Sequence, residues 1–179
     1  KSGVAHFVAQ NEYECMDYIK TLLSYIPQNN TEEPSIVSND DDPNRLDHNL
    51  ISMIPEDSLK PYDMKGIIHS IVDNHNFFEV HELFAQNIIV GFARMNGKTI
   101  GIVASQPLYL AGALDIDSSN KASRFIRFCD CYHIPILTLV VNCPVTTDVS
   151  ITGTLVVMIV SLRPIFKPLL TNVASAELV

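Results

Sequence analysis

The sequence predicts an α/β fold in which helices cover a sheet, and three observations predict it. Two apolar runs flank the turn Met95-Asn96-Gly97-Lys98, and an Asn-Gly pair is typical of a type I′ hairpin turn. A helical pattern follows the second run and ends near Cys131. The almost wholly apolar run 136–141 comes next, as in a buried strand. Strand, loop, helix and buried strand form a βαβ crossover, which implies a parallel sheet covered by helices.

Composition sets the first limits on size and function. The chain has 179 residues, of which 47% are apolar and 18% charged, so it suits one globular domain or pieces of two. The formal net charge of −8, with only scattered Lys and Arg, argues against a nucleic-acid partner. The four cysteines show no CxxC pair and no zinc-like spacing, which indicates reduced thiols in a cytosol-like compartment and predicts no metal site.

Neither the start of the chain nor its apolar runs indicate a targeting or membrane segment. Residues 1–8 lack an initiator Met, and their apolar stretch is too short for a secretory signal, so we expect the chain to start inside a longer protein. The apolar runs 134–141 and 151–162 fall short of the 18 or more residues that span a bilayer. Buried strands or a buried helix are the prediction for both.

The first predicted elements are a strand end at residues 4–8 and an amphipathic helix. Asn11 is suited to cap that helix, with Glu14 three residues later, and Pro27 ends it. Its apolar residues, at spacings of three and four, predict one stripe: Cys15, Met16, Ile19, Leu22, Leu23 and Ile26.

Residues 28–62 predict a linker, because they carry four prolines and no sustained periodicity. Asp40, Asp41 and Asp42 lie in this stretch. Their carboxylates can chelate a cation, but adjacent aspartates in such a loop are typically solvated. We therefore do not read them as a catalytic cluster.

A second unit begins at Asp63, which is suited to cap a helix with apolar residues at Met64, Ile67, Ile68, Ile71 and Val72. Residues 77–80 predict a short strand, and residues 88–94 and 98–104 predict the two arms of the hairpin. Ser118 or Ser119 is expected to cap the crossover helix. The inward stripe of that helix is predicted at Ala122, Phe125, Ile126 and Cys129.

The loop after the hairpin is the best local candidate for a ligand site, because open α/β sheets place ligands at the carboxyl ends of their strands. Ser105 and Gln106 can donate hydrogen bonds there, and Gly112 permits close approach of a ligand. An ordinary connection, in which Gln106 simply ties down the loop, fits these residues equally well.

Several other reactive side chains favour packing or surface roles. No histidine has a second one at metal-ligand spacing, among His6, His69, His75, His81 and His133. Cys129 and Cys131, two apart at a helix end, cannot face the same side and suit small apolar positions. Arg124 and Arg127 share a helix face and can meet a phosphate or a partner carboxylate, although solvation or pairing with Asp130 is favoured.

Several stretches carry a resemblance to a known family. They are Ser2-Gly3-Val4-Ala5-His6-Phe7-Val8-Ala9, residues 22–30, Asp42-Pro43-Asn44-Arg45-Leu46-Asp47, residues 54–57, residues 60–64, residues 87–106, Leu114-Asp115-Ile116-Asp117-Ser118-Ser119 and residues 124–130. Over residues 1–140 the chain resembles the carboxyltransferase β subunit of biotin-dependent acyl-CoA carboxylases, in the propionyl-CoA and methylmalonyl-CoA group that includes transcarboxylase and the decarboxylase α subunits.

The resemblance implies a crotonase-like fold of two lobes, each a ββα spiral. It places the end of the N-terminal lobe at residues 1–30, an interlobe linker at 31–62 and the C-terminal lobe at 63–179. In the family, backbone N–H groups of glycine-rich turns hold the biotin ureido oxygen and the thioester enolate, so no catalytic side chain is implied. The loop carrying Ser105, Gln106 and Gly112 matches a strand-end loop beside the biotin pocket.

The chain departs from the family after residue 140. The family continues into an Asp-Val-Pro-Gly-Phe-like turn, where this chain reads Val141-Asn142-Cys143-Pro144-Val145. The later Gly-Gly-Ala motif has no counterpart, since Gly153 is the only glycine after Gly112. Residues 141–179 are a shortened natural segment, a frame-shifted tail or an incomplete piece. This chain alone is therefore predicted to be inactive as a carboxyltransferase.

Two functions follow as hypotheses. The first is a fragment of a carboxyltransferase subunit that moves carboxylate between carboxybiotin and a short acyl-CoA, propionyl-CoA or methylmalonyl-CoA. The resemblance then implies a biotin carrier domain on an α subunit, a homo-oligomer that is hexameric in the family, and a bacterial cytoplasmic or mitochondrial matrix location. The second is a truncated, non-catalytic paralogue that acts as an assembly or interaction module.

Overall fold

A five-stranded mixed sheet organises the part of the chain that the computed structural model describes, residues 3–42, 45–55, 60–141 and 155–160. The strands lie in chain order and are β1 (Phe77–Val80), β2 (Ile88–Met95), β3 (Lys98–Ser105), β4 (Ile136–Val141) and β5 (Leu155–Val160). The helices are α1 (Glu12–Tyr25), α2 (Asn49–Met53), α3 (Met64–Ile71) and α4 (Ile116–Cys131), with 3₁₀ turns at Asp73–His75 and Leu110–Gly112. The expected α/β class is confirmed.

The predicted hairpin and crossover are both present. β2 and β3 pair antiparallel from Ile88 opposite Ser105 to Met95 opposite Lys98. Asn96 and Gly97 have φ of 51° and 75°, as a type I′ turn requires. β3 and β4 pair parallel, with α4 in the connection. The remaining pairs, β1 with β2 and β4 with β5, are antiparallel, so the expectation of a parallel sheet is wrong beyond the crossover itself.

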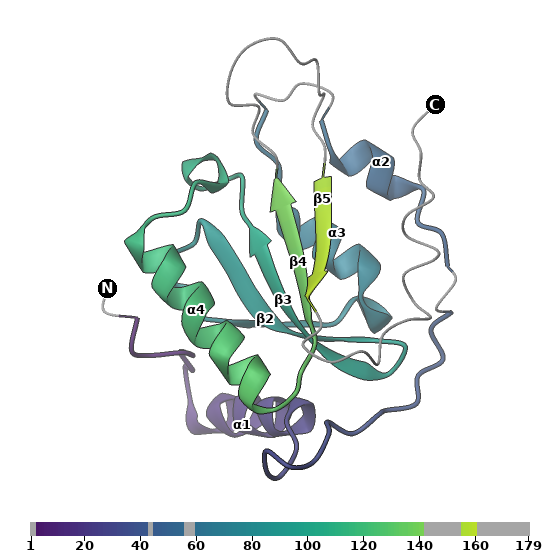
Figure 1. The fold of residues 1–179 in the computed structure, drawn as a ribbon, viewed down its shortest axis with the longest axis vertical. Helices are drawn as coiled ribbons and strands as arrows, with labels where there is room; N and C mark the ends of the chain where they lie inside the picture. The colour runs from purple at the N-terminus through teal and green to yellow at the C-terminus, as the bar shows by residue number, and fades with distance from the viewer. Residues whose placement is uncertain (1–2, 43–44, 56–59, 142–154, 161–179) are drawn as a thin grey trace.

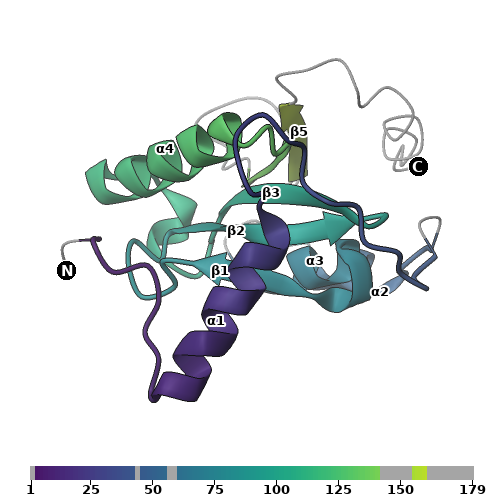
Figure 2. The ribbon, with the colours of Figure 1, turned by 90° about the horizontal axis from the view of Figure 1, so that it is seen from below.

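Helices cover both faces of the sheet, with α4 on one side and α2 and α3 on the other (Figure 2). The strands send alternate side chains to the two faces, as the period of two demands. On β2, Ile89 and Ala93 join the cluster under α3, whereas Val90 and Phe92 join the cluster under α4. Gly101 on β3 lets α4 come close, because a Cβ there would lie 2.7 Å from the Cys129 Sγ.

The first helix is where expected, and its buried face matches the predicted stripe only in part, since Leu22 and Ile26 pack against the core. Asn11 caps α1 by accepting a hydrogen bond from the Glu14 N–H, and the helix ends just before Pro27. Met16, Ile19 and Leu23 are exposed, as is Cys15, while Tyr25 is buried. The Tyr25 ring stacks on Phe78 and Phe92, so aromatic packing joins these aliphatic contacts in setting the orientation of the helix.

Two further N-terminal predictions need correction. Residues 4–8 form no strand; the segment is held instead by single contacts such as the hydrogen bond from the His81 N–H to the His6 carbonyl, at 3.0 Å. The predicted linker contains the short helix α2, and Arg45 ties it to the end of α3 through the Ser70 and Val72 carbonyls, at 2.8 and 2.7 Å. Asp41, expected to be solvated, binds Arg45.

The crossover helix begins earlier than predicted. α4 starts at Ile116 and is capped by Asp115, which accepts a hydrogen bond from the Ser118 N–H, while the Ser118 hydroxyl accepts one from the Asp115 N–H. Ser118 is therefore the third residue of the helix and not its cap. Phe125 and Cys129 are buried as predicted, but Ile126 is exposed and Lys121 is buried in its place.

The second C-terminal apolar run, 151–162, contains β5 at Leu155–Val160, and the rest of it lies outside the described residues. No helix in the described ranges combines the length and the apolar composition that crossing a bilayer needs.

Candidate functional site

The strand-end loop between β3 and α4, at the upper left of Figure 1, is organised around Gln106. Gln106 is 2% exposed, and its N–H donates to the Asn87 carbonyl at 3.0 Å. Its side chain donates to the Asp63 carboxylate at 2.7 Å and accepts from the Met64 N–H at 3.1 Å. Gln106 thus joins the end of β3 to the start of α3 through both ends of its side-chain amide.

Ser105 and Gly112 lie against each other on the half-buried side of this loop. The Gly112 N–H donates to the Tyr109 carbonyl at 2.9 Å, which turns the chain back over the strand end. Gly112 has φ of 74°, and a Cβ on it would lie 3.3 Å from the Ser105 Cβ. Of the three predicted site residues, two are therefore brought together at the surface, and the third points inward.

Asn87 is a buried residue of this loop that the sequence reading missed. It is 3% exposed, and its side-chain amide donates to the Ala113 carbonyl at 2.7 Å and to the Asp115 carboxylate at 3.4 Å. It therefore fixes the far end of the loop just as Gln106 fixes the near end. A polar residue directly before a buried strand was the only sequence signal for it.

The start of α4 is stabilised by its own cap rather than left open for an anion. Hydrogen bonds from the Ser118 backbone and hydroxyl, with a smaller one from Asn87, lower the pKa of the Asp115 carboxyl. The carboxylate thereby satisfies an N–H of the first turn. Together, Asp115 and Asn87 hold the loop that carries Gly112.

Replacing Asp115 with alanine is expected to lower the melting temperature by about 3 °C, because the cap and the Asn87 contact are both lost. Asp117→Ala, in the same exposed first turn but without a capping role, is the matched control and is expected to change the melting temperature less. Thermal unfolding followed by circular dichroism measures both. Equal shifts for the two variants would contradict the assigned cap.

The loop also presents an exposed apolar surface. Its apolar side chains are exposed by 43% to 81%, and they are Leu108, Tyr109, Leu110, Leu114 and Ile116. Scattered exposed apolar residues are ordinary, but five within nine positions form a patch. The loop therefore presents the paired Ser105 and Gly112 together with an exposed apolar surface suited to contact another protein.

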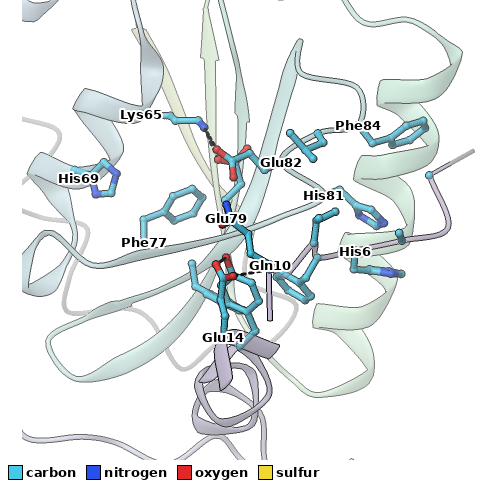
Figure 3. A pocket seen from close by; sticks show the side chains of 17 residues that line it. His6, Gln10, Glu14, Lys65, His69, Phe77, Glu79, His81, Glu82 and Phe84 are labelled. Carbon is cyan, nitrogen blue, oxygen red and sulfur yellow. Dashed lines mark hydrogen bonds and ion pairs between the residues drawn. The ribbon is translucent and has the colours of Figure 1, made fainter. Parts of the chain in front are cut away.

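A hollow of about 880 Å³, away from this loop, is lined by the N-terminal segment, α1, α3, β1 and the turn after β1 (Figure 3). Lys65 from α3 reaches across it to Glu79 at 2.7 Å and to Glu82 at 3.2 Å. Burial lowers the pKa of Lys65, but the hydrogen bonds and charges of the two carboxylates outweigh this and leave the pKa raised. Glu14 adds a third carboxylate, so this hollow disfavours phosphates and carboxylates.

The histidines behave as packing groups. His69 and His75 bond to each other's backbone carbonyls through Nδ1, at 2.7 and 2.8 Å. His81 is 4% exposed and stacks on His6, with ring centroids 3.9 Å apart. Within the described ranges, no three His, Cys, Asp or Glu side chains gather closely enough to hold a metal ion.

The remaining reactive side chains divide by burial. Cys129 is buried, which raises the pKa of its thiol to about 12, while Cys131 is exposed, so the two face different sides as predicted. Arg124 donates to the Gly3 carbonyl at 3.0 Å and Arg127 to the Ser123 carbonyl at 3.2 Å. Both arginines are exposed, as the predicted solvated face requires, and they bond to backbone carbonyls rather than to Asp130.

Comparison with known proteins gives a consistent result. A sequence model of the family described as "Carboxyl transferase domain" matches residues 1–144. The methylmalonyl-CoA decarboxylase subunit alpha of Veillonella parvula is 50% identical over 139 residues, which cover 78% of this chain and 27% of that protein. The propionyl-CoA carboxylase beta chain of Roseobacter denitrificans is 48% identical over 140 residues, covering 78% and 28%.

Solved structures show the same likeness. A crystal structure of transcarboxylase 12S, described as a hexamer assembly with hydrolysed methylmalonyl-coenzyme A bound, has a TM-score of 0.73 and 43% identity. The match covers 75% of this chain and 26% of that one. The chain thus spans little more than a quarter of the length of these relatives.

Proposed function

The chain belongs to the carboxyl transferase domain family, and from that premise we propose that it is part of a subunit that transfers carboxylate between carboxybiotin and a short acyl-CoA. The observation that carries the proposal is identity of 48% to 50% to two enzymes of propionyl-CoA and methylmalonyl-CoA over residues that include the whole β3–α4 loop. Propionyl-CoA and methylmalonyl-CoA are accordingly the proposed substrates. The full-length protein, not this segment by itself, is the proposed enzyme.

The fold supports this assignment. The crotonase-like architecture expected from the resemblance is confirmed by the likeness to transcarboxylase 12S and to a long-chain acyl-CoA carboxylase. The boundary expected near residue 140 agrees with a family match that ends at residue 144. We propose the division into lobe end, linker and second lobe at 1–30, 31–62 and 63–179.

In this proposal Ser105 and Gly112 form part of the wall beside the biotin ring. When bound, carboxybiotin would supply the carboxyl group. Ser105 offers a hydroxyl to a small ring there, and a Cβ on Gly112 would lie 3.3 Å from the Ser105 Cβ, so glycine keeps a side chain from pressing on Ser105. Gln106 acts as a positioning residue, since its side chain is occupied by Asp63 and Met64.

We propose partners that follow from the same family. A biotin carboxyl carrier domain, on an α subunit or a separate chain, would deliver the carboxyl group, and copies of this subunit would assemble as a hexamer. The hexamer assembly of transcarboxylase 12S supports the second point. The relatives include bacterial proteins and the mitochondrial propionyl-CoA carboxylase beta chain of Homo sapiens, which supports a bacterial cytoplasmic or mitochondrial matrix location.

The experiment is a carboxyl-transfer assay of the full-length subunit that carries these residues, with its biotin carrier and propionyl-CoA. Gly112→Val is expected to raise the KM for the biotin carrier at least tenfold with little change in the KM for propionyl-CoA, because a side chain would press on Ser105. Gly66→Ala is the matched control, since a Cβ at Gly66 meets only the Met53 sulfur, at 3.9 Å. An unchanged KM for the carrier would remove Gly112 from the site.

The second candidate function is a non-catalytic assembly module, favoured by the exposed apolar patch of the loop. The residue 1–179 chain is expected to show no transfer above background. If the full-length subunit is inactive too, yet binds an active carboxyltransferase subunit, the module is the better description. Measurable transfer by the chain alone would contradict the prediction that it is inactive.

A further inference from the structure

A second cavity, of about 400 Å³, lies between the N-terminal segment and α4; it adjoins the acidic hollow, with which it shares His6, Phe7 and His81, but none of the three carboxylates lines it. Its interior is aromatic and aliphatic: Phe92 comes from β2, Phe125 and Phe128 from α4, and Leu22 from α1. Phe92 packs against Phe125 and Phe128 with ring centroids 5.0 and 5.9 Å apart. The walls are therefore fixed by packing, and the interior suits an apolar ligand body.

The polar lining residues of this cavity are all basic groups. His6 and Arg124 are exposed, and His81 lies behind His6 in the stacked pair. None of the lining residues is acidic. Lys121, one helical turn before Phe125, adds a buried ammonium on the same helix. Burial lowers the pKa of His81 to about 4, so this imidazole is uncharged at pH 7, and the local positive charge that favours an anion comes from Arg124 and Lys121.

Arg124 is placed to bind such an anion. Its guanidinium donates one hydrogen bond, from Nη1 to the Gly3 carbonyl at 3.0 Å, which holds the side chain against the N-terminal segment. A guanidinium carries five N–H donors, so others remain for a ligand. Its planar fork matches a carboxylate better than a spherical anion.

We propose that this cavity binds a small organic carboxylate, with an alkyl or aryl body among the phenylalanines and the carboxylate at Arg124 and His6. A volume of about 400 Å³ accommodates a body of medium chain length, as in octanoate. This site does not depend on the proposed carboxyl transfer, because neither Ser105 nor Gly112 is among its lining residues.

Titration of the full chain with octanoate and with octan-1-ol, followed by isothermal calorimetry and amide chemical shifts, tests the proposal. Octanoate is expected to bind with a Kd on the order of 10⁻⁴ M and to shift the amides of Phe92, Phe125 and Phe128. In Arg124→Gln its affinity is expected to fall about tenfold, as loss of a charge-assisted hydrogen-bonded pair predicts. Arg127→Gln, three residues away on the exposed surface, is the matched control.

Octan-1-ol separates the charge effect from damage to the cavity. It has the same body and no charge, so its affinity is expected to stay the same in Arg124→Gln if the cavity remains intact. Equal losses for both ligands would mean that Arg124 only holds the N-terminal segment, and would overturn its role in binding the anion. Equal effects of Arg124→Gln and Arg127→Gln, shifts confined to other residues, or no saturable binding at millimolar octanoate would also overturn the proposal.

Discussion

Replacing Lys121 with methionine is expected to lower the free energy of unfolding by about 3 kcal/mol, because it strips three backbone carbonyls of their donor. Lys121 is 1% exposed, and its Nζ donates to the carbonyls of Phe84 and Ile88 at 2.8 Å and of Ala85 at 3.3 Å. Methionine keeps the length of the side chain but cannot donate. The carbonyls would then be left without this partner, which is the costly part of the change.

The low pKa of Lys121 predicts that the free energy of unfolding depends on pH in the alkaline range. Burial, with a smaller contribution from the charge of Lys65, lowers the pKa of Lys121 to about 8, although Glu79 and Glu82 oppose this. The unfolded chain holds that proton up to about pH 10.4. Between these two pKa values the unfolded state binds more protons than the folded state. The free energy of unfolding therefore rises with pH over this range. The stability difference between the native chain and Lys121→Met should therefore grow from pH 8 to pH 10.

Urea unfolding at a series of pH values measures both effects. Lys20→Met is the control, because Lys20 is an exposed lysine of α1 that pairs only with Asp17, at 3.7 Å. A change within about 0.5 kcal/mol is expected there. If the two variants lose similar stability, the three hydrogen bonds of Lys121 do not hold the turn before β2.

Local sequence patterns were sufficient to predict the elements that depend on neighbouring residues alone. The Asn96-Gly97 turn, the apolar runs of β2 and β3, and the caps at Asn11 and Asp63 each depend on residues that are close in sequence. The crossover then followed from the order of elements, since a parallel neighbour needs a helix between the strands. That is why the hairpin, α3 and β4 were found within one or two residues.

The misses have a common physical origin in contacts between distant residues. Nothing in the sequence singles out Lys121, because its carbonyl partners lie 33 to 37 positions earlier in the chain. Tyr25 helps to set the orientation of α1 by stacking on rings of β1 and β2. No periodicity within the helix shows either partner. Tertiary packing overrides local pattern at such positions.

The candidate loop was located from the sequence, but its internal roles were not settled there. The order of elements placed Ser105, Gln106 and Gly112 at a strand end. Whether Gln106 faced a ligand or the protein depended on Asp63 and Met64, which are 43 and 42 positions away. Asn87 has no motif at all, so only the three-dimensional structure identifies it as the residue that anchors the loop to Ala113.

Acidification is expected to destabilise the fold through His81 by about 3 kcal/mol between pH 7 and pH 4. Burial, with smaller contributions from the nearby His6, Lys121 and Arg124, lowers the pKa of His81 to about 4, against a hydrogen bond to the Gly3 backbone that raises it. The unfolded chain has a histidine pKa near 6.5. As the pH falls through that value, the unfolded state takes up the proton first, so stability is lost until about pH 4 and is fully present above about pH 6.5.

His81→Asn tests this cause directly, because asparagine tolerates the positive φ of 58° at this position and does not titrate. The variant is expected to lose most of the slope between pH 6.5 and pH 4 in the free energy of unfolding. His133→Asn is the matched control, since His133 has a nearly identical φ of 56° but does not face His6. An acid slope that survives in His81→Asn would locate the sensitivity elsewhere. Loss of the slope would show that one stacked imidazole fastens the N-terminal segment to the turn after β1 only while it stays neutral.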